Sequence, residues 1–172
     1  MKILILILLV VSHLTYAGES WWNDFSYVPK NKSYNNINAE AFNKYFTSIE
    51  FYSCDNYKIF TKEQCDDIAK YGGKFELEID YNKDGKNELW NIGIAKNDDD
   101  WYPYATVIMV RDAKSLKILQ ILKIDSTHPH FSIFNKYKES LAVYNCMLCA
   151  HHIEIIWDGT TWDFKPAEQL PD

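Results

Sequence analysis

The sequence predicts an α+β fold: short N-terminal helices followed by an antiparallel β-meander that forms a sandwich, an open barrel or a partial propeller-like sheet. Two patterns of hydrophobic spacing support this prediction. Between residues 39 and 72, apolar side chains recur every three or four positions, as in an amphipathic helix. From residue 74 onward, apolar and polar residues alternate, as in strands with one buried face. Because these strands follow one another directly, antiparallel pairing is favoured over parallel crossovers.

Residues 1–17 have the composition of a signal peptide. Lys2 precedes the apolar run ILILILLVV, and a small-residue cleavage site ends at Ala17. The apolar run is shorter than the roughly 20 residues needed to cross a bilayer, so we expect no stable membrane insertion. We therefore expect residues 18–172 to form a single α+β domain that is secreted or periplasmic.

The chain is acidic, with a formal net charge of -6 and a single arginine, Arg111. Such a charge argues against binding to nucleic acid, whose phosphates require clusters of Lys and Arg. A cationic partner fits the charge better, and the demands of solubility alone also explain it.

The N-terminal third of the chain predicts an extended segment and a helix. Residues 18–37 are aromatic and polar without any period, which indicates an extended lead-in with aromatic anchors. Asn38 is a suitable cap for a helix over residues 39–50. The apolar stripe of this helix would consist of Phe42, Tyr45, Phe46 and Ile49.

A second, shorter helix is predicted after Thr61. Thr61 and Gln64 have the spacing of a capping box, and Gly72 and Gly73 end the helical pattern. The strands predicted after this helix cover residues 74–80, 88–95, 105–110, 116–124, 131–134, 140–145, 152–157 and 161–165. Asp158 and Gly159 predict a tight hairpin between the last two.

The turn at residues 80–88, DYNKDGKNE, is rich in oxygen ligands. Calcium requires six to eight oxygens and a chain that bends tightly around the ion. Gly85 permits the bend, and the ligands predicted for calcium are the side chains of Asp80, Asn82, Asp84 and Glu88 and the carbonyl of Lys86. A metal-free polar hairpin turn is the alternative.

An EF-hand does not explain this turn, because Asn91 stands where an EF-hand has Glu and strands flank the loop. The spacing D-x-N-x-D-G-x-x-E instead resembles the calcium loop of FG-GAP and related propeller-type repeats over about 20 residues. This resemblance implies an extracytoplasmic β scaffold that binds calcium, and it implies no reaction. A chain of this length is too short to build a whole propeller from such repeats.

The cysteines and histidines permit two interpretations. Four cysteines in an exported chain predict two disulfides, and the shortest loops favour pairing Cys54 with Cys65 and Cys146 with Cys149. Alternatively, the second pair could bind zinc or copper with neighbouring histidines, of which the candidates are His128, His130, His151 and His152.

Two functional classes remain open from the sequence. A cell-envelope hydrolase would need a carboxylate pair, for which the candidates are Glu76, Glu78, Asp98, Asp99 and Glu154. No nucleophile with a recognisable catalytic context is present. We therefore favour a protein-binding or inhibitory module, of the immunity-protein or lysozyme-inhibitor type, directed at a basic cell-envelope enzyme. Its predicted interface is the acidic and aromatic loop formed by Asp98, Asp99, Asp100, Trp101 and Tyr102.

Overall fold

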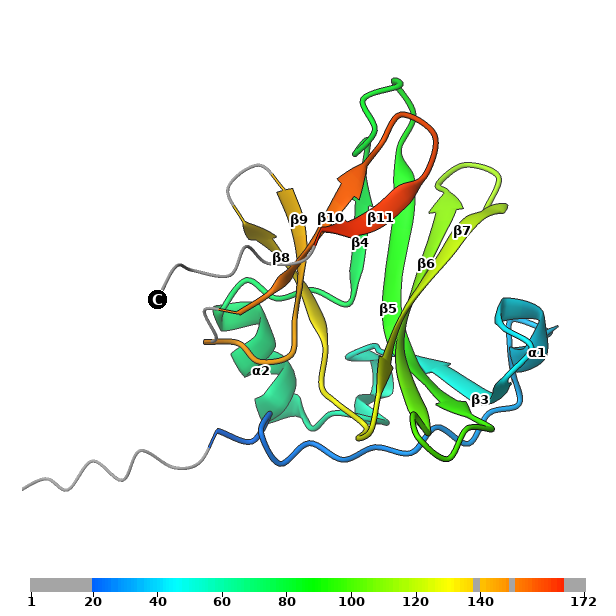
Figure 1. The fold of residues 1–172 in the computed structure, drawn as a ribbon. Coiled ribbons are helices and arrows are strands. Elements are labelled where there is room, and N and C mark those ends of the chain that lie inside the picture. Colours follow the sequence, from blue (N-terminus) through cyan, green and yellow to red (C-terminus); the bar gives the residue numbers. More distant parts are fainter. Residues whose placement is uncertain (1–19, 138–139, 149–150, 166–172) are drawn as a thin grey trace, which may run out of the picture.

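The computed structural model describes residues 20–137, 140–148 and 151–165, and the predicted signal peptide 1–17 lies outside them. The fold is mostly β, with 43% of the described residues in strands and 11% in helices, so the predicted α+β class is wrong. Three antiparallel sheets are present in the described part of the chain, and they do not close into a barrel. Figure 1 shows the two larger sheets side by side, with the short helices α1 and α2 on opposite sides of the molecule.

The larger sheet has the strand order β3-β5-β6-β7, and β4 also pairs with β5. Strand β5 is its organising element, because β4 pairs with the first half of β5 while β3 pairs with the second half on the same side. The strands of this sheet are β3 (Phe46–Phe51), β4 (Glu76–Ile79), β5 (Glu88–Asn97), β6 (Tyr104–Asp112) and β7 (Ile118–Ser126).

The second sheet is a four-stranded meander in the order β11-β10-β9-β8. Its last hairpin turns at Asp158 and Gly159, as predicted, and Gly159 adopts the left-handed backbone with φ 99° that this turn requires. The strands of this sheet are β8 (Ile133–Tyr137), β9 (Ser140–Tyr144), β10 (Ile153–Trp157) and β11 (Trp162–Lys165).

Backbone and side-chain hydrogen bonds join the two sheets at both edges. At one edge, Lys74 and Phe134 exchange backbone hydrogen bonds of 3.0 and 2.8 Å, which connects the segment before β4 to β8. At the other edge, the Gln120 amide on β7 takes the place of a strand neighbour. Its Nε2 donates to the Trp162 carbonyl at 2.6 Å and its Oε1 accepts from the Trp162 N–H at 2.9 Å.

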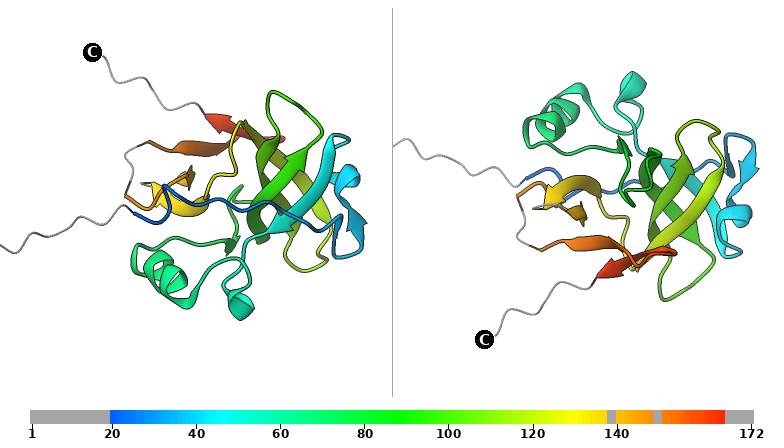
Figure 2. Two further views of the ribbon diagram at one scale, coloured as in Figure 1. Left: turned by 90° about the horizontal axis from the view of Figure 1, so that it is seen from below. Right: turned by 90° about the horizontal axis from the view of Figure 1, so that it is seen from above.

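Two hydrophobic cores cover the two faces of the larger sheet. The main core lies between the sheets and includes Trp90, which is fully buried. The aromatic lead-in packs on this core, where Trp21 contacts Phe131 edge to face at 5.0 Å. The smaller core lies beneath α1 (Ala39–Phe42) and the two-stranded sheet of β1 (Ser33–Tyr34) and β2 (Ile37–Asn38). Figure 2 shows α1 and α2 on different sides of the strands.

The predicted helix over residues 39–50 is wrong beyond its first turn. Helix α1 ends at Phe42, and residues 46–51 form β3 instead. Pairing with β5 supplies the backbone hydrogen bonds of this segment, and a register shift between Phe46 and Ser48 places Phe46 in the same core as Ile49. Tyr45, expected on the apolar stripe, is 52% exposed.

Gly93 on β5 explains how closely β3 approaches this strand. A Cβ atom at this position would lie 2.3 Å from the Glu50 carbonyl oxygen and 2.6 Å from the Phe51 Cα. Real Cβ contacts are not this short, so any side chain at position 93 would push β3 away from β5. A β-strand glycine is therefore required where the two backbones meet.

The second predicted helix is confirmed. Helix α2 (Lys62–Lys70) begins with the complete capping box of Thr61 and Gln64. The predicted Cys54 to Cys65 disulfide is present and ties α2 to the short 3₁₀ helix η1 (Asp55–Tyr57) through the loop before it. The predicted pairing of Cys146 with Cys149 lies partly outside the described residues. None of the helices in the described ranges is long and apolar enough to cross a membrane.

Replacing Gln120 with leucine should separate the two sheets at the β7 edge. Leucine has similar volume but leaves the Trp162 N–H and carbonyl without their partners, which costs about 1–3 kcal/mol for each unsatisfied buried group. The free energy of unfolding, measured by urea denaturation, should fall accordingly. Lys123→Leu on the same strand is the control, because Lys123 bonds Asp125 and not the second sheet. Equal stability of both variants would contradict this role for Gln120.

Candidate functional site

The turn between β4 and β5, residues 80–88, reverses the chain tightly. Asp80 follows the last residue of β4 and Glu88 begins β5, so the turn joins two paired strands. Lys83 and Gly85 have φ values of 61° and 88°, and these left-handed residues reverse the chain. The space beside Gly85 is open, so its backbone angle rather than crowding selects glycine here.

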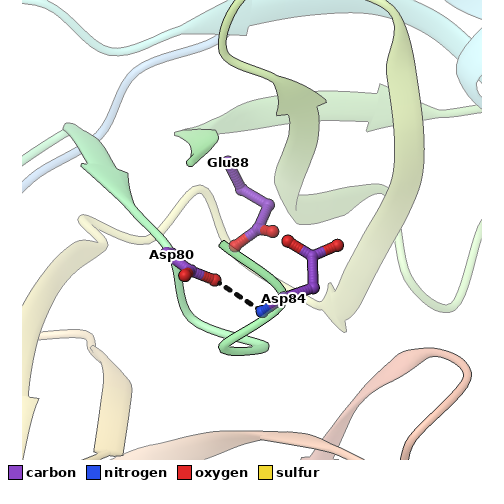
Figure 3. Close-up of side chains that lie close together, drawn as sticks. All are labelled: Asp80, Asp84 and Glu88. Carbon is purple, nitrogen blue, oxygen red and sulfur yellow. Dashed lines mark hydrogen bonds between the residues drawn. The ribbon is translucent and has the colours of Figure 1, made fainter. Parts of the chain in front are cut away.

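Three carboxylates converge inside this turn. Asp80, Asp84 and Glu88 each place an oxygen within 4.8 Å of the other two. Figure 3 shows the three side chains directed toward a common space, with Glu88 on the strand side and both aspartates on the turn. Glu88 is only 2% exposed, whereas Asp84 faces solvent. This carboxylate group could hold a metal ion, because hard cations prefer clustered carboxylate oxygens.

Backbone N–H groups fix the orientation of these oxygens. The two oxygens of Asp80 accept from the N–H groups of Asp84 at 3.0 Å and Gly85 at 2.9 Å. The amide oxygen of Asn82 also accepts from the Asp84 N–H at 3.0 Å, so Asn82 belongs to the same network. Lys86 donates its backbone N–H to Asp84 at 2.9 Å. The predicted ligand residues are thus arranged around one turn.

Tyr81 ties the turn to the second sheet. Its backbone N–H donates to Glu88 Oε2 at 2.8 Å. Its hydroxyl donates to the Ile155 carbonyl on β10 at 2.5 Å and accepts from the Leu141 N–H on β9 at 3.3 Å. The Tyr81 ring packs edge to face on Trp90 at 5.8 Å. Tyr81 therefore connects the conformation of the turn to the contact between the sheets.

Without a cation, the charged form of the Glu88 carboxyl is disfavoured. Burial raises the pKa of the Glu88 carboxyl, and the neighbouring charges of Asp80 and Asp84 raise it further. The hydrogen bond from Tyr81 opposes this effect only in part. A divalent ion among the three carboxylates would remove the repulsion and favour the charged form of Glu88.

The loop at residues 98–102 lies at the far end of β5 and is exposed, as the interface prediction requires. Asp98 donates its N–H to the Tyr45 carbonyl at 2.8 Å, which anchors the loop beside β3. Asp99 Oδ1 accepts from the N–H groups of Trp101 at 2.8 Å and Tyr102 at 3.1 Å. These backbone hydrogen bonds lower the pKa of the Asp99 carboxyl.

Trp101 is presented to solvent by this ordered turn. Its side chain is 83% exposed and that of Tyr102 is 50% exposed, while Asp98, Asp99 and Asp100 are also exposed. By contrast, Trp22 is buried, and Trp21 and Tyr104 pack partly buried on the main core. The aromatic residues of the predicted loops therefore divide into core residues and this exposed pair.

The structure does not assemble the histidines into a metal site in the described residues. His128 and His130 contact each other edge to face at 6.2 Å, and burial together with His128 lowers the pKa of His130. His152 stacks on Tyr144 at 5.1 Å. In the parts of the chain that the structure describes, three potential ligand side chains converge only at Asp80, Asp84 and Glu88.

The carboxylates considered for hydrolysis are distributed over separate elements. Glu76 and Glu78 alternate along β4, where they accept hydrogen bonds from Asn91 and Asn87, respectively. Asp98 and Asp99 follow the opposite end of β5, and Glu154 belongs to β10.

Sequence analysis missed a cleft between β3, η1 and α2. The residues that line it, among them Tyr34, Asp55 and Glu76, are distant in sequence and carry no shared motif. The signal that was available is the Cys54 to Cys65 pair, since both cysteines line the cleft and the bond between them brings its walls together.

The raised pKa of Glu88 predicts how the stability of the metal-free protein depends on pH. An acid whose pKa is higher in the folded state stabilises the fold fully below its unfolded pKa, and this contribution disappears as pH rises through the folded pKa. With chelator present, the free energy of unfolding should therefore fall from about pH 4.5 upward. Glu88→Gln keeps an acceptor for Tyr81 and should remove this dependence. Glu63→Gln, at an exposed position, is the control. Identical profiles for wild type and Glu88→Gln would refute the prediction.

No protein-family model matches the chain, and neither a curated protein nor a solved structure gives a significant match. The functional inference therefore rests on the geometry of the turn at 80–88 and of the loop at 98–102.

Proposed function

We propose that this chain is an exported protein-binding module of inhibitory or immunity type that captures a basic partner protein. The observation that carries this proposal is Trp101, a large aromatic side chain 83% exposed on a turn that hydrogen bonds hold in place. Aromatic residues that are fixed before binding lose little conformational freedom in a complex, and tryptophan is enriched among residues that dominate binding energy.

The surroundings of Trp101 favour a cationic partner. Asp98, Asp99 and Asp100 precede it directly, and all three are exposed. The hydrogen bonds to Asp99 keep this carboxylate ionised by lowering its pKa. An aromatic anchor with acids beside it complements a surface in which Lys or Arg surrounds an apolar pocket. The chain's net charge of -6 would also steer a basic protein toward the loop.

Two features support export as the setting of this function. The Cys54 to Cys65 disulfide is present, and such bonds persist mainly in oxidising compartments outside the cytosol. The sequence of residues 1–17 has the order of a signal peptide. The basic partner we propose is therefore a secreted or periplasmic protein, such as an enzyme that acts on the cell envelope.

The turn at 80–88 is proposed to bind calcium in a stabilising role. Its donors are carboxylate and amide oxygens on a loop with the spacing of the FG-GAP calcium motif, and one of the carboxylates is buried. Calcium tolerates irregular oxygen cages, whereas magnesium demands a near-octahedral set and retains its water. Because Tyr81 connects the turn to β9 and β10, the ion would stabilise the contact between the sheets.

Calcium should raise the thermal stability of the wild-type protein. A ligand at a hundred times its dissociation constant stabilises a folded protein by about 2.7 kcal/mol. Asp84→Asn should lose most of this gain, because it removes one of the three converging charges. Asp100→Asn makes the same exchange outside the turn and should keep the gain. Melting curves recorded in calcium and in chelator measure the effect. A melting temperature indifferent to calcium would overturn the proposal for this turn.

Trp101→Ala should weaken the capture of a basic protein. Loss of an anchoring tryptophan costs about 2 kcal/mol or more, which corresponds to roughly thirtyfold in affinity. A basic lysozyme is the probe, and surface plasmon resonance against the immobilised chain measures its affinity. Asp99→Lys should also weaken binding through charge reversal. Leu119→Ala, at a 46% exposed position on β7, is the control. Binding of equal strength in the tryptophan variant would remove this loop from the interface.

A further inference from the structure

A cleft of about 590 Å³ opens between the end of β3, helix α2 and the start of β4. A smaller hollow of about 260 Å³ lies next to it, and Tyr34, Phe51, Ser53 and Asp55 line both. Figure 2 shows α2 and η1 projecting on one side of the molecule, away from β10 and β11. The cleft lies beyond the end of β3, whereas the loop at 98–102 is anchored beside Tyr45, before its start.

Aromatic rings form much of the lining. Phe51, Tyr52 and Phe75 are largely buried and contribute to the inner surface, and Tyr34 contacts Phe51 with 4.6 Å between ring centroids. Tyr57, which also lines the cleft, is 53% exposed. The faces of aromatic rings attract ammonium and guanidinium groups within about 6 Å of the ring centre.

Carboxylates dominate the charge of the same cleft. Asp55, Asp66 and Glu76 line it, together with one cationic side chain, Lys74. Asp66 is already paired with Lys62 at 2.6 Å, a surface interaction that costs little to rearrange. Asp55 accepts from the hydroxyl of Ser53 at 2.8 Å, a neutral donor, so its negative charge is not neutralised by this contact.

Glu76 is held in place by an oriented amide. Asn91 Nδ2 donates to Glu76 Oε2 at 2.6 Å, and Asn91 Oδ1 accepts from Arg111 Nη2 at 2.7 Å. The buried guanidinium of Arg111 therefore determines which way the Asn91 amide points, and the amide in turn fixes Glu76. In the described residues Arg111 has no ion pair, and its hydrogen bond to Asn91 links it to Glu76.

The cleft is also covalently preorganised. Cys54 and Cys65 both line it, and their disulfide fixes the loop that carries Ser53, Asp55 and Tyr57 against α2. A wall fixed in this way lowers the entropic cost of binding a ligand. The volume of the cleft exceeds that of one lysine side chain, so a short peptide segment fits the cleft better than a single amine.

We propose that this cleft binds a basic peptide segment, with a lysine or arginine side chain placed between the aromatic lining and the carboxylates of Asp55 and Glu76. This is a second site, separate from the loop at 98–102, and it does not depend on the function proposed for that loop. The peptide's ammonium or guanidinium group supplies the cation, and no covalent chemistry is involved.

Titration of the ¹⁵N-labelled protein with a trilysine peptide tests the proposal by NMR. Shifts should centre on backbone amides of the cleft, including those of Ser53, Tyr57 and Lys74. Asp55→Asn and Glu76→Gln should each weaken binding by up to about fivefold, the magnitude expected when one exposed ion pair is lost. Glu63→Gln also removes one carboxylate charge, but Glu63 is an exposed residue of α2 that does not line the cleft. This control variant should therefore change the affinity less than about twofold.

Two further ligands distinguish the sources of the cation. Trilysine acetylated on its side chains should not bind, and spermidine should bind more weakly than the peptide. Trp101→Ala should leave the trilysine-induced shifts of the cleft amides unchanged, which separates this site from the loop. The proposal is overturned if the cleft amides do not shift, if acetylated peptide binds equally well, or if spermidine matches the peptide. Should Glu76→Gln fail to fold, Asp55→Asn decides the outcome, because Asp55 is exposed.

Discussion

The structure depends most on how Tyr81 and Glu88 close the turn before β5. Strand β5 pairs with β3, β4 and β6, so its starting point sets the register of the larger sheet. Glu88 begins this strand as a buried carboxylate beside two others, and Tyr81 bonds both Glu88 and the backbone of the second sheet. Repulsion among the three carboxylates of this turn is thereby coupled to the packing of both sheets.

The two proposed binding surfaces occupy different ends of β3 on this scaffold. The loop at 98–102 contacts the residue before β3, and the cleft lies beyond its last residue, Phe51. Both surfaces combine carboxylates with aromatic side chains, but they differ in shape. Trp101 projects from a convex turn, whereas the cleft is concave and is fixed by a disulfide. A basic partner that is large enough could reach one surface with an apolar pocket and the other with a flexible segment.

Local patterns in the sequence predicted much of the β structure. Alternation from residue 74 onward located the strands, and the spacing of Thr61 and Gln64 located α2. The short loop between Cys54 and Cys65 predicted their disulfide correctly. The oxygen spacing of the turn at 80–88 identified the three carboxylates that converge. In each case the information lies within a few neighbouring residues.

Features that depend on distant partners were not predictable in this way. The spacing of Phe42, Tyr45, Phe46 and Ile49 fits a helix, and only pairing with β5 opposite Gly93 makes the second half a strand. One of the links between the two sheets is made by Gln120, a single side chain without any local pattern. The packing of Trp21 and Trp22 on the main core, in contrast to the exposure of Trp101, likewise follows from the three-dimensional structure.

We propose that calcium neutralises the carboxylates around Glu88. Because the pKa of Glu88 is raised in the metal-free turn, calcium binding at acidic pH should release protons. Calorimetric titration with calcium in buffers of different ionisation enthalpy measures this release. The binding enthalpy should vary with the buffer at acidic pH, and this variation should shrink toward neutral pH. Absence of calcium binding, or binding whose enthalpy is the same in every buffer, would contradict it.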